Sequence, residues 1–179
     1  YPATSTSYSE THQYLDDDPT ATASDTYAIS VTVTDDDTGS DTVATSVIVN
    51  NVAPIATATG AEIDENGVAT VSGTIVDPGT LDTFTITIDW GEGAPVDYSY
   101  PATSTSYSET HQYLDDNPTA TASDTYAISV TVADDDTGVD TADTTVKVNN
   151  VAPVTTAVGD VISEGQSATV SATFTDTGT

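Results

Sequence analysis

The chain has 179 residues, with 29 Asp and Glu against one basic side chain, Lys147, so its formal net charge is -28. This composition argues against nucleic acid as a partner, because binding a polyanion requires clustered Lys and Arg side chains. Self-repulsion of this size destabilises a compact chain unless ions screen it, so the charge favours bound divalent metal, high salt or both.

The residue types also limit the fold class and the compartment. The chain contains no Cys, so no disulfide framework holds the fold. No hydrophobic run reaches membrane-spanning length and no signal peptide is recognisable, so we expect an interior stretch of a larger protein with no membrane insertion. Charged residues gather between short runs in which β-branched and aromatic residues alternate with Thr and Ser, a pattern that predicts an all-β fold.

The sequence repeats itself with a period of 99 residues. Residues 1–33 recur at 100–132 with a single substitution, and the motif NNVAP at 50–54 recurs at 149–153. A period of this length suits one whole domain per repeat rather than a solenoid unit. The Pro of NNVAP ends strand pairing and its Asn residues favour a turn, so this motif is the predicted joint between domains.

Division at NNVAP predicts three units. Residues 1–51 form the C-terminal half of one repeat, residues 52–150 form a complete repeat, and residues 151–179 form the N-terminal part of a following repeat. The two incomplete units need further chain or a neighbouring molecule to complete them.

The complete repeat contains six segments with a strand pattern. In chain order these are residues 56–59, 69–76, 83–90, 107–114, 126–132 and 144–148. The clearest is 83–90, where every second residue from Phe84 to Trp90 is apolar, as one buried face of a strand requires. An acidic turn, DENG at 64–67, precedes the second segment. The sequence DDDTG at 134–138 predicts a hairpin in which Gly138 takes the left-handed conformation.

Six or seven short strands in about 100 residues, separated by turn residues, predict an immunoglobulin-like β-sandwich. An enzyme is not expected, because no set of acid, base and nucleophile side chains converges in any recognisable motif. His111 lies near acidic residues, but the structural interpretation of this histidine is favoured over a metal ligand or a catalytic base. Trp90 is interpreted as a core residue, because its apolar neighbours on the same strand share its face.

Three motifs resemble the polycystic kidney disease (PKD) type repeat in the divergent form of large prokaryotic surface proteins. They are DPGTLDTFTITIDWGEG at 77–93, THQYLDD at 110–116 and YAISVTVADDDTG at 126–138. The chain departs from that family at Glu92, where Asp is usual. The resemblance implies tandem immunoglobulin-like (PKD-type) sandwiches of about seven strands. It also implies a role in extracellular spacing, adhesion or contact with carbohydrate.

Acidic turns and the Asn residues of the joint are the candidate metal ligands. In an array of domains placed end to end, the loops of one domain approach those of the next, and their carboxylate, amide and carbonyl oxygens suit Ca²⁺. The candidate ligands are Asp35, Asp36, Asp37, Asn50, Asn51, Asp64, Glu65, Asp134, Asp135, Asp136, Asn149, Asn150 and Glu164. Two alternatives stay open: Asp is common in ordinary β-turns, and an acidic surface also suits molar salt.

The function expected from these observations is that of a structural or adhesive repeat module. Such a module belongs to a large extracellular or cell-surface protein, for example an adhesin, a sheath, an S-layer or a fibre. Its partners would be neighbouring repeats or copies of itself, with Ca²⁺ stiffening the joints. The alternative is a carbohydrate-binding accessory module of a secreted hydrolase, in which exposed tyrosines stack on sugars.

Overall fold

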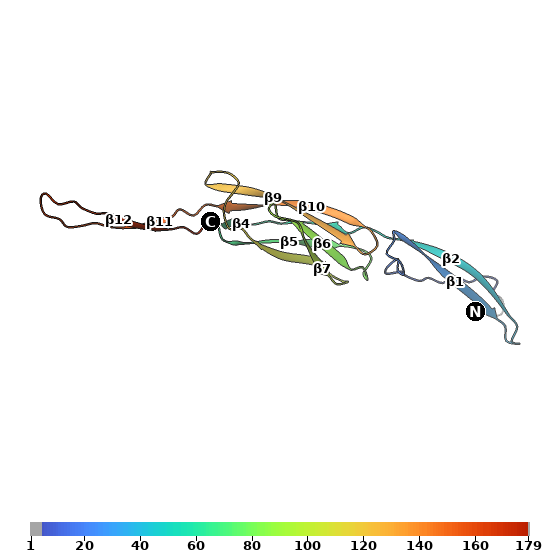
Figure 1. Cartoon of the computed structure of the whole chain (residues 1–179). Coiled ribbons are helices and arrows are strands. Elements are labelled where there is room, and N and C mark those ends of the chain that lie inside the picture. The colour runs from blue at the N-terminus through green and yellow to red at the C-terminus, as the bar shows by residue number, and fades with distance from the viewer. Residues whose placement is uncertain (1–4, 179) are drawn as a thin grey trace.

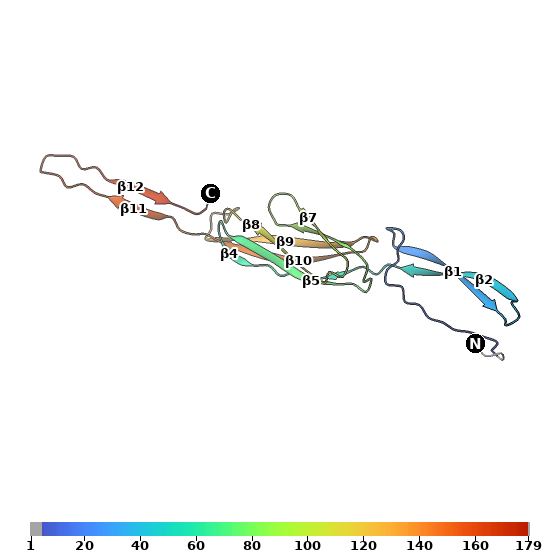
Figure 2. The ribbon, with the colours of Figure 1, turned by 90° about the horizontal axis from the view of Figure 1, so that it is seen from below.

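Residues 5–178, which the computed structural model describes, form twelve β-strands and no helix (Figure 1), so the predicted all-β fold is confirmed. The strands are β1 (Ser24–Thr34), β2 (Ser40–Asn50), β3 (Ile55–Ala56), β4 (Glu62–Asp64), β5 (Val68–Val76), β6 (Phe84–Asp89), β7 (Val96–Tyr100), β8 (Ser106–Gln112), β9 (Ser123–Asp134), β10 (Val139–Asn149), β11 (Val154–Val158) and β12 (Ser171–Thr175). Three groups of strands lie end to end, with hairpin β1–β2 and hairpin β11–β12 at opposite ends (Figures 1 and 2).

Two sheets enclose the core in the middle of the chain. One sheet has the strand order β4-β10-β9-β6-β7 and the other has the order β3-β5-β8. Strands of both sheets contribute to a single cluster of buried hydrophobic side chains that extends from Ala69 to Val148 in the sequence. This architecture is β-sandwich-like and is consistent with an immunoglobulin-like sandwich.

The alternating strands bury the face that the sequence indicated. Ile86, Ile88, Val130 and Val132 are fully buried, and Trp90 is 1% exposed. Burying a side chain of this size stabilises the folded state by roughly 1.5–3 kcal/mol relative to leaving it in water. The interpretation of Trp90 as a core residue is therefore confirmed.

Two strands of the larger sheet were not predicted. Strand β4 has three residues, too few for an alternating pattern, and it pairs in parallel with β10 through Ile63 and Val148. Strand β7 pairs antiparallel along nearly all of β6, with Tyr98 opposite Ile86. Strand β4 overlaps the first residue of the predicted DENG turn, in which Asn66 adopts a left-handed backbone conformation with φ of 60°.

Each outer hairpin corresponds to part of the sandwich but, within residues 5–178, has no second sheet packed against it. Hairpin β1–β2 has the same register as hairpin β9–β10, because both follow the same repeated sequence. Val33 is 61% exposed, whereas its repeat equivalent Val132 is fully buried. Phe174 on β12 is 75% exposed, whereas its equivalent Ile75 on β5 is 2% exposed. The same sequence positions are thus buried only where both sheets are present.

Candidate metal centres

The NNVAP motif at 50–54 follows hairpin β1–β2 and is hydrogen-bonded to the loop between β9 and β10. The side-chain Nδ2 of Asn51 donates to Asp134 Oδ2 at 2.8 Å and to the carbonyl oxygen of Asp136 at 3.2 Å. The backbone N–H of Asn51 donates to the carbonyl oxygen of Ala23 at 3.1 Å. One residue is therefore hydrogen-bonded to both sides of the joint.

The β9–β10 loop is closed by the Asp134 carboxylate. Its Oδ1 accepts hydrogen bonds from the backbone N–H groups of Asp136 at 3.0 Å and Gly138 at 2.6 Å. The prediction that Gly138 takes the left-handed conformation is wrong, because Thr137 takes it, with φ of 77°. Gly138 is needed for close approach instead: a Cβ there would overlap Asp134 Oδ2 and lie 2.7 Å from the Cα of Ala53 across the joint.

Two acidic clusters lie beside this joint. In each, one oxygen from every member lies within 4.8 Å of the others. The bridging triad consists of Asp16, Asp17 and Asp136, and the loop triad consists of Asp77, Asp82 and Asp134. The bridging triad joins the first group of strands to the sandwich, whereas the loop triad lies within the sandwich. Both can hold a metal ion.

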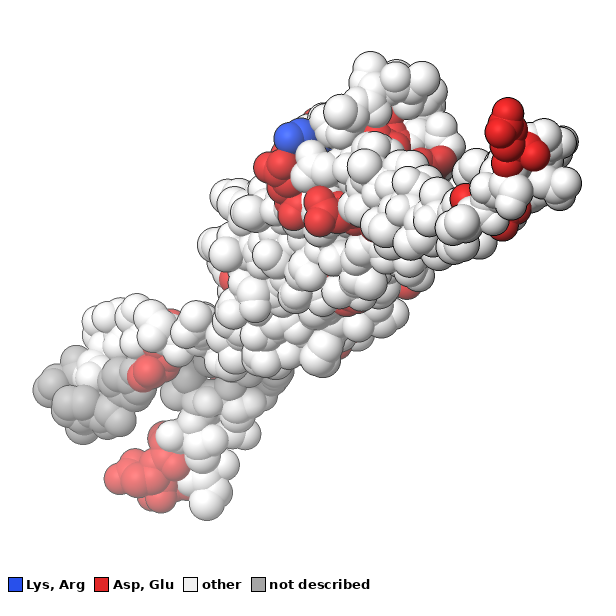
Figure 3. Space-filling model, turned by 90° about the vertical axis from the view of Figure 1, so that its left-hand side faces the viewer, with Lys and Arg blue, Asp and Glu red and all other residues white. Residues whose placement is uncertain are grey.

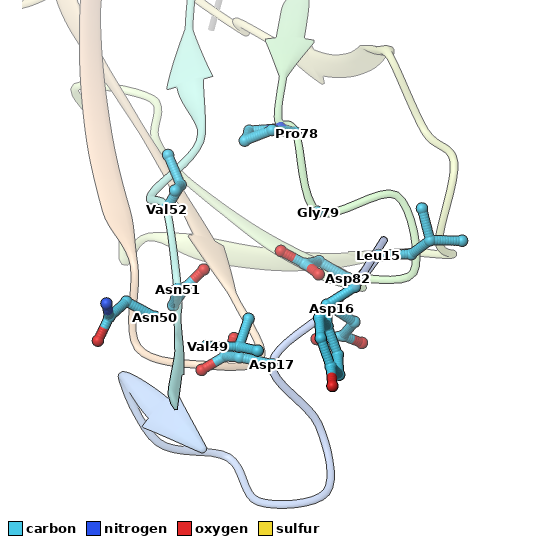
Figure 4. A pocket seen from close by; sticks show the side chains of 11 residues that line it. Leu15, Asp16, Asp17, Val49, Asn50, Asn51, Val52, Pro78, Gly79 and Asp82 are labelled. Atoms are coloured by element: carbon cyan, nitrogen blue, oxygen red, sulfur yellow. The ribbon is translucent and has the colours of Figure 1, made fainter. Parts of the chain in front are cut away.

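A cavity of about 110 Å³ opens between the two triads (Figure 4). Asp16 and Asp17 reach it from the loop that precedes β1, and Asp82 reaches it from the loop between β5 and β6. A cavity needs roughly 10–15 Å³ to hold one water molecule, so this one has room for more than one ion with its water ligands.

Several carboxylate oxygens at this joint are buried without a hydrogen-bond donor. Asp17 is 2% exposed and Asp82 is 1% exposed. Oδ2 of Asp17, Oδ1 of Asp82 and Oδ2 of Asp77 have no hydrogen-bond partner among the described residues. A buried carboxylate that lacks a compensating charge or donor destabilises the fold by several kcal/mol. These oxygens are therefore placed to receive a cation.

The electrostatics of the joint lead to the same conclusion. Burial, followed by repulsion from Asp77, raises the pKa of Asp82 to about 7. Burial, followed by repulsion from Asp17, raises the pKa of Asp136 to about 7. Burial is also the largest cause of the raised pKa of Asp17 and Asp77. In each case the folded environment disfavours the ionised form, and a positive charge among these groups would relieve that cost.

A third cluster lies at the opposite end of the sandwich. This far triad consists of Glu65, Asp115 and Asp116, again within 4.8 Å, and its two aspartates are the repeat equivalents of the acidic pair in the bridging triad. Glu65 Oε1 accepts a hydrogen bond from the backbone N–H of Val151 at 2.7 Å, and the Glu65 N–H donates to the carbonyl oxygen of Asn149 at 2.8 Å. Asp116 is 6% exposed, and its Oδ2 has no hydrogen-bond partner in the described part of the chain.

The structure brings together some of the predicted ligands. Glu65, Asp134 and Asp136 belong to triads, and Asn51 is hydrogen-bonded to Asp134 and to the backbone of Asp136. Asn50 lines the cavity without joining either triad. The remaining predicted ligands lie outside the triads: Asp35, Asp36, Asp37, Asp64, Asp135, Asn149, Asn150 and Glu164.

Six triad members were missed by the sequence analysis. They are Asp16, Asp17, Asp77, Asp82, Asp115 and Asp116. A signal for two of these pairs existed, because LDD at 15–17 recurs at 114–116, at the end of the predicted strand segment 107–114. Four strands, β6 to β9, lie between the β5–β6 and β9–β10 loops and place both loops at the same end of the sandwich, since each pair of strands returns the chain to its starting end. This count includes β7, which was not predicted, so the sequence alone did not bring the two loops together.

The aromatic residues near the far triad have structural roles. His111 Nε2 lies 2.8 Å from Glu92 Oε1, and the His111 ring stacks on Trp90 with 5.1 Å between ring centroids. The hydroxyl of Tyr113 donates to the carbonyl oxygen of Trp90 at 2.7 Å. These contacts hold the loop after β6 against β8, in agreement with the structural interpretation of His111.

No basic side chain balances the triads. Lys147 is the only Lys or Arg in the chain (Figure 3). Its Nζ lies 2.8 Å from Glu62 Oε1. Both side chains of this pair are largely exposed, and the pair is separate from all three triads. The chain therefore has no Lys or Arg side chain left to compensate the charge of the triads.

No family model matches the sequence, and no curated protein matches it. Within the described residues, there is no helix of the length and apolar character that a membrane span needs.

Proposed function

We propose that this chain is a run of tandem immunoglobulin-like, PKD-type sandwiches that serve as structural or adhesive modules of an extracellular or cell-surface protein. Ca²⁺ bound at the joints makes consecutive modules act as one stiff rod. The observation that carries this proposal is the joint itself, where buried carboxylates from two consecutive repeats line one cavity without any basic side chain.

The exposed core positions of the outer hairpins support the tandem arrangement. Val33 and Phe174 are exposed where their repeat equivalents are buried. Covering each of these side chains would contribute roughly 1.5–3 kcal/mol. Residues 1–51 and 151–179 are therefore best understood as parts of further sandwiches of the same kind.

Calcium suits this joint better than magnesium. Ca²⁺ accepts six to eight oxygen ligands in irregular geometry, whereas Mg²⁺ requires a near-ideal octahedron and retains several waters. The joint offers carboxylates from three separate loops, and Asn50 and Asn51 also line its cavity, so the available ligands form an irregular set. Loops that belong to two modules can adjust to Ca²⁺ more easily than to the smaller ion.

The carbohydrate-binding alternative receives less support, because the tyrosines that could stack on sugars have internal partners. The Tyr100 hydroxyl donates to Glu109 Oε1 at 2.6 Å, and the Tyr107 hydroxyl donates to the carbonyl oxygen of Thr57 at 2.7 Å. Trp90 is 1% exposed. A sugar platform needs an exposed ring face, so we favour the structural role.

The proposal is tested by comparing the protein after EDTA treatment with the protein in CaCl₂, MgCl₂ and NaCl at equal ionic strength. Ca²⁺ should raise the melting temperature and narrow the distribution of molecular lengths measured by small-angle X-ray scattering. A response to NaCl equal to that to CaCl₂ would instead assign the acidity to adaptation to high salt, and an unchanged molecule in all three salts would end the proposal.

Two neighbouring substitutions supply a matched control. Asp17→Asn removes a carboxylate of the bridging triad and should weaken the Ca²⁺ response. Asp18→Asn removes an exposed carboxylate one residue further on and introduces the residue that the second copy already has, Asn117. It should leave the response unchanged.

A further inference from the structure

We infer that a complete joint is a single centre of seven carboxylates that binds three Ca²⁺ ions, and that each joint in this chain displays only part of it. This inference rests on the proposed function and extends it to the composition of the site. At the first joint, around the NNVAP motif at 50–54, the chain supplies the bridging and loop triads. At the second joint, around the NNVAP motif at 149–153, it supplies the far triad.

The 99-residue period relates the two joints to each other. Asp115 and Asp116 of the far triad occupy the same positions in their repeat as Asp16 and Asp17 of the bridging triad. Equivalent acidic pairs therefore face Glu65 at the second joint and Asp136 at the first joint. In an uninterrupted array both neighbours are present at every joint, so the pair is shared between two ion positions.

A pair of equivalent glycines places the loop triad in the same centre. At the first joint, a Cβ on Gly79 would overlap the carboxylate of Asp82. At the second joint, a Cβ on the equivalent Gly178 would overlap the carboxylate of Glu65. One glycine position thus lies against both carboxylates, so in a complete joint the equivalents of Glu65 and Asp82 lie close to each other.

Each part of this centre contains a buried carboxylate oxygen that has no donor in the described stretch of chain. Asp17 in the bridging triad, Asp82 in the loop triad and Asp116 in the far triad are each at least nine-tenths buried, and each has an unpartnered carboxylate oxygen among the described residues. Seven carboxylates within one desolvated centre repel strongly, and three divalent cations neutralise all but one of these charges. The Asp pair then holds adjacent ions together across the joint.

The most direct test uses a chain lengthened with a further copy of part of its own repeat. Thr179 corresponds to Thr80 in the repeat, so residues 81–150 appended after Thr179 complete both the third sandwich and the second joint. Calorimetric titration with Ca²⁺ should find three more ions per lengthened chain than per original chain. Two of them belong to the completed second joint, and one belongs to a new far triad at the free end.

A variant of the lengthened chain isolates the completed joint. Replacing the appended copies of Asp82 and Asp136 by Asn should remove two of the three additional ions and keep the third, while the circular dichroism spectrum stays unchanged. A lengthened chain that gains one ion, or whose variant loses none, would overturn the inference even if the original chain binds Ca²⁺ and stiffens. An original chain that does not respond to Ca²⁺ would instead refute the proposed function.

Terbium gives a second readout that does not depend on stoichiometry. Tb³⁺ occupies Ca²⁺ sites. Tyr14 lines the cavity at the first joint, and its repeat equivalent Tyr113 precedes the acidic pair of the second joint, so a tyrosine can sensitise the luminescence at each joint. If ions are adjacent, energy transfer from Tb³⁺ to Eu³⁺ should increase severalfold in the lengthened chain. Transfer equal to that in the variant would show that the ions are isolated and would overturn the shared centre.

Discussion

Replacing Asp136 by Asn should have opposite effects on stability in EDTA and in Ca²⁺. Asp136 is 4% exposed and shares the bridging triad with Asp16 and Asp17, all within 4.8 Å. Without a cation, each pair of unit charges at this distance repels by roughly 3 kcal/mol at an effective permittivity near 20. Proton uptake and local rearrangement relieve most of this repulsion. We therefore expect Asp136→Asn to raise the free energy of unfolding in EDTA by about 1–2 kcal/mol.

In Ca²⁺ the original protein should be more stable than the Asp136→Asn protein, the opposite of the order expected in EDTA. At about 1,000 times its dissociation constant, a ligand that binds only the folded state stabilises it by about 4.1 kcal/mol. If loss of one charged ligand weakens binding about a hundredfold, the variant gains only about 1.4 kcal/mol at the same concentration. In Ca²⁺ the Asp136→Asn protein should therefore be the less stable of the two, by about 1 kcal/mol.

The free energy of unfolding of the sandwich can be measured in both buffers by urea unfolding, followed by the fluorescence of Trp90, the only tryptophan. Two controls separate the joint from charge alone. Asp143→Asn removes an exposed carboxylate from β10 of the same sandwich. Asp37→Asn changes the same position of the DDDTG sequence in the first copy, where the side chain is exposed. The reasoning fails if Asp136→Asn acts with the same sign in both buffers, or if either control reproduces its reversal.

Three further predictions concern packing and pH. Val132→Ala removes a fully buried side chain and should lower the free energy of unfolding by about 2 kcal/mol, whereas Val33→Ala, at a position 61% exposed, should change it by less than about 0.5 kcal/mol, as measured by chemical denaturation. Gly138→Ala forces a Cβ against backbone across the joint and should lower the melting temperature by several degrees, whereas Gly39→Ala meets only the carboxylate within its own hairpin loop and should have a smaller effect. Burial, followed by a neighbouring tyrosine, raises the pKa of Tyr107 to about 12, so the unfolded state loses this proton first. Stability should be fully present below pH 10 and fall between about pH 10 and 12, and the Tyr107→Phe protein should show a shallower fall in alkaline unfolding experiments.

The strands that carry the core were predictable because their burial follows a period of two. The residues from Phe84 to Trp90 alternate with Thr and Asp, and every second one is buried. Strand β4 has three residues and takes its place through parallel pairing with β10. No local pattern encodes such a strand, because its neighbour lies more than 80 residues away in the sequence.

The sequence predicted that carboxylates gather at the joints, but it did not predict which carboxylates form each triad. The end-to-end arrangement led to carboxylates at NNVAP, and three of the predicted acidic residues, Glu65, Asp134 and Asp136, do lie in triads. Asp82 was missed because its role depends on which loop faces it across the joint. A single Asp after a Gly-Thr-Leu segment is locally typical of an ordinary turn, and only the folded structure shows that its loop and the LDD loop at 15–17 line the same cavity.

Identical sequences with different environments show where the centre is encoded. Asp37 and Asp136 both end the triplet of DDDTG, and both hairpins close with the same backbone hydrogen bonds to the first Asp of the triplet. Asp37 is exposed, whereas Asp136 is 4% exposed, because only Asp136 has another group of loops opposite it. The environment of this carboxylate is therefore a property of the contact between repeats and not of the repeat alone. If cations bind there, the number of sites should grow with the number of joints, and each cation should stabilise the alignment of two modules as well as the fold of either one.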